Sequence, residues 1–143
     1  MFRNPKRMFR LHLSGAGKGQ SLVEVGLLMP LLVLMLAGIL DLGRAYMTLV
    51  ALNDAAAEGA AYAAIHPTDT TQIVARTADS SNALVTLDAN LVSVTYVDPP
   101  TPGNPITVTV GYEYQLLTPV LNAIVPGGSI TMTATSVCSI MGY

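Results

Sequence analysis

The chain has little charge and few aromatic residues for its length. Only 11% of its 143 residues are charged, tryptophan is absent, and both phenylalanines, Phe2 and Phe9, lie near the N-terminus. Apolar residues make up 51% of the chain, which excludes a disordered protein. A high apolar content combined with a low content of charged residues indicates a membrane segment. The rest of the chain is long enough for one small folded core.

Residues that hold metals or perform covalent chemistry are also scarce. Cys138 is the only cysteine, so an internal disulfide is excluded, and the two histidines are His12 and His66. Serine and threonine are plentiful, but their positions fit strand faces and helix caps. No metal-ligand cluster, nucleophile elbow or phosphate loop is visible in the sequence. We therefore expect no enzymatic activity, no metal and no cofactor.

Basic charge is concentrated at the N-terminus. Five of the seven basic residues precede residue 20, whereas residues 20–143 hold nine acidic residues against Arg44 and Arg76. An acidic body argues against a nucleic-acid partner. Basic residues beside a hydrophobic run obey the positive-inside rule, so the sequence predicts a cytoplasmic N-terminus and an extracytoplasmic remainder.

One uncharged run, Val25–Leu40, is long enough to form most of a membrane helix. Its 16 residues span about 24 Å at about 1.5 Å per residue, so Leu22 and Val23 are needed to approach a bilayer core about 30 Å thick. Pro30 predicts a local kink, which a membrane helix tolerates because neighbouring groups satisfy the freed carbonyl.

Both ends of this run carry distinctive residues. Gly15, Gly17 and Gly19 precede it and disfavour a helix, so we expect a flexible, accessible stretch there. Asp41 and Arg44 follow it and lie three residues apart. We expect them to form an exposed ion pair where the helix leaves the membrane.

The helical pattern continues beyond Asp41 in an alanine-rich stretch that ends near His66, because Pro67 disfavours helix in the residue before it. Small residues recur every four positions in two rows: Ala55, Gly59 and Ala63, and Ala56, Ala60 and Ala64. Such rows allow close packing. Their partner is either the protein's own domain or a neighbouring subunit, and the spacing favours neither.

The region after residue 66 predicts one short helix and three strands. Thr68–Thr71 can cap the helix, which would carry Ile73, Val74, Thr77 and Ala78 on one face. Apolar and polar residues then alternate over 91–96, 106–114 and 130–134. A proline-rich loop at 98–105 and a turn at Pro126-Gly127-Gly128 separate these strands.

These elements predict an α+β fold. We expect a long N-terminal membrane-spanning helix that extends outside the membrane, then a short helix and a small antiparallel sheet of about three strands. The expected parts are a basic leader at 1–19, the helix at 20–66 and an extracytoplasmic domain at 67–143.

The segment Gly19-Gln20-Ser21-Leu22-Val23-Glu24 resembles the prepilin-peptidase site of type IV pilins and pseudopilins. More specifically, residues 19–46 resemble the N-terminal signature of TadE-like proteins, which are minor pilins or pseudopilins of tight-adherence pilus systems. The matching residues are Gly19, Gln20, Glu24, Pro30, Gly38 and the run Asp41-Leu42-Gly43-Arg44.

The resemblance implies a function in pilus assembly and adhesion. It implies cleavage after Gly19, which would make Gln20 the first residue of the mature chain and Glu24 the fifth. The implied partners are a prepilin peptidase, other pilin subunits, the pilus assembly platform and the lipid bilayer. The implied location is the bacterial inner membrane as a single-pass protein, with later entry into an extracellular pilus.

Two alternatives remain open from the sequence. Ser21 and Glu24 also fit a capping box, in which each side chain bonds to a backbone N–H at a helix start. The chain could instead be an uncleaved single-pass anchor of a pilus or secretion assembly platform. A secreted soluble protein is disfavoured, because the signal-peptidase-like Ala55-Ala56-Ala57 lies too far beyond Leu40.

Overall fold

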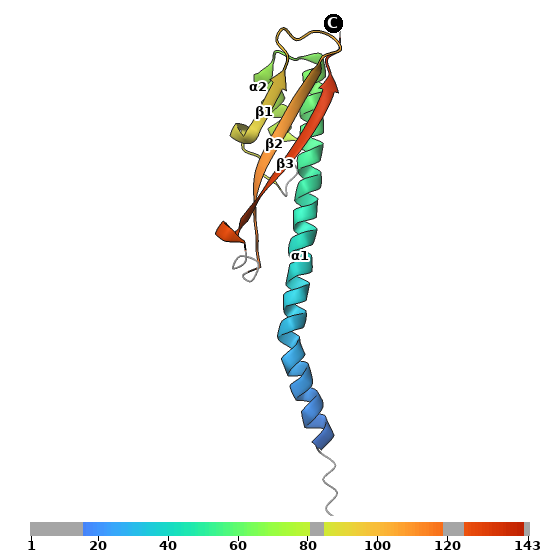
Figure 1. Ribbon diagram of the computed structural model, residues 1–143, viewed down its shortest axis with the longest axis vertical. Helices are drawn as coiled ribbons and strands as arrows, with labels where there is room; N and C mark the ends of the chain where they lie inside the picture. The colour runs from blue at the N-terminus through green and yellow to red at the C-terminus, as the bar shows by residue number, and fades with distance from the viewer. Residues whose placement is uncertain (1–15, 81–84, 119–124, 142–143) are drawn as a thin grey trace, which may run out of the picture. The chain divides into compact units, whose positions relative to one another are not determined.

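The computed structural model describes residues 16–80, 85–118 and 125–141 (Figure 1). The chain divides into two compact units, Met1–Leu36 and Ala37–Tyr143. The first helix, α1 (Ala16–Ile65), contributes residues to both units.

Within the first unit, the described residues belong to the beginning of α1. All side chains from Gly19 to Leu36 are exposed, and α1 is long and apolar enough to cross a membrane. The expectation of a flexible stretch up to Gly19 is wrong for the part described, because the helix already begins at Ala16. Each glycine weakens a helix, but a helix that is already formed extends at little further cost, since each added residue gains a hydrogen bond.

In the second unit, α1 supplies one side of the hydrophobic core. The core includes Ala51, Leu52, Ala55, Ala56, Ala60 and Ala63. The two rows of small residues therefore pack against the protein's own domain, which decides between the two partners that the spacing left open. The helix ends at Ile65, as Pro67 predicts.

The short helix α2 (Thr70–Asp79) packs on the same core. Its N-cap is Asp69, whose side chain accepts a hydrogen bond from the Gln72 N–H at 3.2 Å. Ile73 and Thr77 are buried, which confirms the predicted helix and its apolar face.

Three strands form an antiparallel sheet in the order β1 (Val92–Tyr96), β2 (Pro105–Gln115) and β3 (Ser129–Ser139). Val94 pairs with Val108, and Val110 pairs with Ala134. The central strand β2 buries Ile106, Val108 and Val110 completely. Short 3-10 turns precede β1 at Ala89–Leu91 and β3 at Pro126–Gly128.

The observed elements confirm the α+β prediction, including the three strands and their antiparallel arrangement. The helix residues that pack on the sheet are part of the compact unit that starts at Ala37. The predicted boundary between residues 66 and 67 therefore lies inside this unit, because a long stretch of α1 is needed to complete the core.

Candidate functional site

Asp41 of α1 is a buried acid in the second unit, and its carboxylate accepts several hydrogen bonds. Its carboxylate accepts hydrogen bonds from the backbone N–H groups of Leu117 at 3.3 Å and Thr118 at 2.8 Å, and from the Thr118 hydroxyl. Asp41 is only 3% exposed. A buried carboxylate is destabilising unless donors replace its water, and the segment that follows β2 supplies those donors.

Tyr114, near the end of β2, makes a further link to the same turn of α1. Its hydroxyl donates to the backbone carbonyl oxygen of Asp41 at 3.2 Å. Burial raises the pKa of the Tyr114 hydroxyl above its ordinary value of 10.0, so the group stays protonated and can donate. Side-chain and main-chain bonds thus join α1 to the end of β2.

Arg44 lies on the outer side of this site. Its Nη1 atom is 3.9 Å from Asp41 Oδ1, and its guanidinium lies 5.9 Å from the centre of the Tyr114 ring. The side chain of Arg44 is 53% exposed. The expectation that both members of the pair are exposed is wrong for Asp41, because the Leu117–Thr118 backbone covers its carboxylate.

An apolar cavity of about 300 Å³ adjoins Asp41 within the second unit. Besides Asp41, the cavity is lined by Gly38, Leu42, Ala45, Leu116, Val125 and Ile130. These side chains offer no nucleophile, acid or base. Among the described residues there is also no group of three or more His, Cys, Asp or Glu side chains that could hold a metal ion.

The remaining predicted site residues lie on the first part of α1. Gly19, Gln20, Ser21 and Glu24 are exposed. Within the described parts of the chain, Glu24 has neither a side-chain hydrogen bond nor an ion pair, so its carboxylate is available to a partner. Pro30 lies inside the continuous helix, and the kink stays a prediction.

The capping-box interpretation of Ser21 and Glu24 is wrong for the chain described here. The helix begins five residues before Ser21, at Ala16. A residue inside a helix cannot act as its N-cap, because the following N–H groups already bond to carbonyls one turn earlier. Capping therefore does not explain why a glutamate lies at position 24, next to the apolar run.

The residues that surround Asp41 could not be predicted from the sequence. Leu117 and Thr118 act largely through backbone N–H groups, which every residue except proline carries, so their side chains gave no signal. Tyr114 fits the alternating pattern of a strand, which by itself predicts no contact with α1. The sequence feature that pointed to this site was Asp41 itself, an acidic residue directly after a long apolar run.

The family model described as TadE-like protein matches residues 19–61. Residues 19–61 are TadE-like. The match confirms the resemblance predicted from the sequence and covers about a third of the chain, from Gly19 through the Asp41 site into the small-residue rows. Neither the search of curated proteins nor the search of solved structures gave a match.

A TadE-like segment is typical of pilin-like proteins that are associated with tight-adherence pili. In this chain, the segment contains the apolar part of α1, which fits a single-pass membrane protein. It also contains both Asp41 and Arg44, so the junction between the apolar run and the domain belongs to the matched region.

Proposed function

We propose that the protein is a minor pilin that takes part in the assembly of a tight-adherence pilus and in adhesion. The TadE-like match over residues 19–61 carries this proposal. The exposed apolar side chains between Gly19 and Leu36 support it, because such a surface requires lipid or neighbouring helices to cover it.

In this proposal a prepilin peptidase removes the basic leader on the cytoplasmic side, and the domain faces outward. Cleavage after Gly19 requires the helix to unwind locally between Ala16 and Gly19. Gly17 and Gly19 make this easier, since each glycine weakens a helix by about 0.8–1.0 kcal/mol relative to alanine. The apolar helix stays with the mature chain and holds it first in the bilayer and then among other pilin subunits.

The alternative is an uncleaved single-pass anchor of a pilus or secretion assembly platform. The helical backbone at the cleavage site favours this alternative, because proteases act most readily on exposed, non-helical segments. The two proposals differ in one measurable quantity, the N-terminal residue of the chain in piliated cells.

Mass analysis of the chain from cells with a cognate prepilin peptidase tests the proposal. We expect a mature chain that starts at Gln20, and we expect Gly19→Val to leave the chain starting at Met1. Gly26→Val is the matched control, because Gly26 lies in the same helix and, like Gly19, has open space around an added Cβ. A wild-type chain that starts at Met1 in piliated cells would overturn the processed-pilin proposal and favour the anchor.

A further inference from the structure

Large apolar side chains gather on the surface around the Asp41 site. Leu42 of α1 is 71% exposed, and Leu117, which follows β2, is 73% exposed. Ile130, at the start of β3, is also exposed. Together with Leu116 and Val125, these three residues form what we call the Leu117 patch. Clustered exposed apolar side chains mark a site of interaction with a membrane or another molecule.

The cavity beside Asp41 extends this patch inward. Its lining residues are apolar apart from Asp41, whose two carboxylate oxygens already accept hydrogen bonds from Leu117 and Thr118. The cavity therefore offers an occupant apolar contact and no free polar group. Its volume of about 300 Å³ is sufficient for a stretch of hydrocarbon chain.

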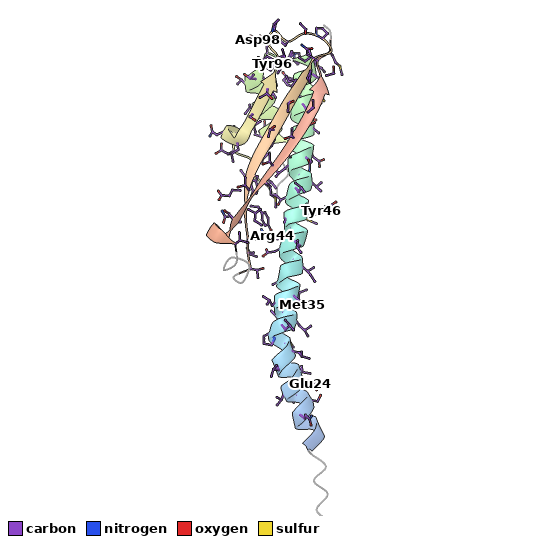
Figure 2. The ribbon with its side chains drawn as sticks, in the orientation of Figure 1. Glu24, Met35, Arg44, Tyr46, Tyr96 and Asp98 are labelled. Carbon is purple, nitrogen blue, oxygen red and sulfur yellow. The ribbon has the colours of Figure 1, made fainter. Side chains whose placement is uncertain are left out.

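The patch lies at the level where α1 would leave the bilayer. The last residues of the uncharged run, 37–40, belong to the same unit, and the Asp41 carboxylate holds the Leu117 backbone directly at the end of that run. Arg44 and the exposed Tyr46 follow directly along α1 (Figure 2). Tyrosine and snorkelling arginine are typical residues of the membrane–water interface.

The sequence around the patch is free of charge. Residues 114–143 contain no Asp, Glu, Lys, Arg or His, whereas residues 20–113 hold nine acidic residues. A charged side chain opposes entry into lipid. This part of an otherwise acidic body therefore lacks the groups that would keep it away from a bilayer.

We propose that the Leu117 patch inserts into the leaflet it faces and that lipid acyl chains fill the cavity. The domain then has a second membrane contact beside α1. A bilayer fits better than a second copy of the chain, because Leu42 of the patch follows residues 37–40, the end of the uncharged run, along the same helix. This inference goes beyond pilus assembly and requires only that α1 spans the membrane.

The absence of tryptophan makes the proposal directly testable, since a single introduced Trp reports on one position. The full chain is placed in phosphatidylcholine vesicles that contain lipids brominated on their acyl chains. Leu117→Trp is the test variant, because Leu117 binds Asp41 through its backbone and not its side chain. Leu40→Trp in the apolar run is the positive control.

Val97→Trp is the negative control. Val97 is an exposed apolar residue between Tyr96 and Asp98, which lie at the opposite end of the sheet from Arg44 (Figure 2). We expect brominated lipid to reduce the emission of Leu117→Trp nearly as much as that of Leu40→Trp and to leave Val97→Trp unchanged.

Each other outcome overturns the proposal in a distinguishable way. If Leu40→Trp is quenched but the emission of Leu117→Trp is as unaffected as that of Val97→Trp, the patch lies in water. Blue-shifted emission of Leu117→Trp without quenching shows that protein covers the patch instead of lipid. If Leu40→Trp is not quenched, α1 does not lie in the bilayer. The proposed membrane contact of the patch is then wrong as well.

Discussion

Gly59 shows how a single residue determines the packing of the domain. A Cβ atom at this position would lie 2.0 Å from Thr77 Oγ1 and 3.2 Å from Val108 Cγ1. The first distance is far shorter than any van der Waals contact. Thr77 cannot easily move away, because its buried hydroxyl donates to the Ile73 carbonyl oxygen at 2.7 Å. Gly59 is therefore required for α1 to pack against α2 and β2 at this distance.

We predict that Gly59→Ala lowers the free energy of unfolding of the domain by about 1–3 kcal/mol, the usual effect of overpacking a core. Chemical unfolding of the full chain in detergent, followed by circular dichroism, measures the change. Gly43→Ala is the matched control, because an added Cβ there has no neighbour within 4 Å and alanine favours the helix.

A double mutant tests whether the contact with Thr77 causes the effect. Thr77→Ala removes the hydroxyl and should make Gly59→Ala less damaging than it is in the wild-type background, so the two changes should not add. If Gly59→Ala is as mild as Gly43→Ala, the close approach described here is not present in the protein.

At the scale of elements, the Asp41 site determines how α1 is joined to the end of β2. Replacement of Asp41 by Asn preserves the shape of the side chain but turns one acceptor oxygen into an NH₂ donor. That donor would face an N–H group of Leu117 or Thr118, and at least one buried hydrogen bond would be lost.

We therefore expect Asp41→Asn to lower the melting temperature of the domain clearly below that of the wild-type chain. Asp54→Asn is the control, because Asp54 is an exposed acid on the same helix. Thermal melting of the full chain in detergent, followed by circular dichroism, compares the three proteins. Equal melting temperatures for all of them would mean that Asp41 does not hold the segment after β2.

The elements themselves were largely predictable because local residues determine them. Pro67 ended α1, Asp69 capped α2, and the alternation in β1, β2 and β3 gave the strands. The start of α1 was predicted wrongly, since glycine propensity acts on single residues while helix extension is cooperative.

The candidate site was predictable only in part. The residues of the TadE-like motif were visible in the sequence, and Asp41 was among them. The surroundings of Asp41 were not visible, because they depend on tertiary packing that brings Leu117 and Thr118 to a residue more than seventy positions away. The burial of Asp41 could not be derived from an i, i+3 spacing, which describes the helix alone.

At the scale of the whole molecule, the described part of α1 from Gly19 to Leu36 presents one unpaired carboxylate on a largely apolar surface. Glu24 is exposed among apolar neighbours such as Val23 and Val25. A charged side chain inside a bilayer is destabilising by up to about 2.5–3.5 kcal/mol at a helix centre and by less near its edge. A positively charged partner would offset this cost.

Processing would create such a partner on a neighbouring subunit, since cleavage after Gly19 leaves a free amine on Gln20. We infer that Glu24 pairs with that amine when helices assemble. A competing role arises in the processed chain, where Ser21 would lie at the helix start and Glu24 could complete a capping box. Glutamine fills the capping role as well as glutamate does, but it cannot supply the charge.

We predict that Glu24→Gln and Glu24→Leu are both cleaved after Gly19 and that both fail to enter pili, with Gln nearly as defective as Leu. Immunoblots of sheared pili and of membranes measure the incorporated fraction. Glu58→Gln is the matched control, because Glu58 is an exposed glutamate farther along α1, and it should enter pili normally. Normal incorporation of Glu24→Gln beside a defective Glu24→Leu would show that Glu24 caps the helix and that charge pairing does not drive assembly.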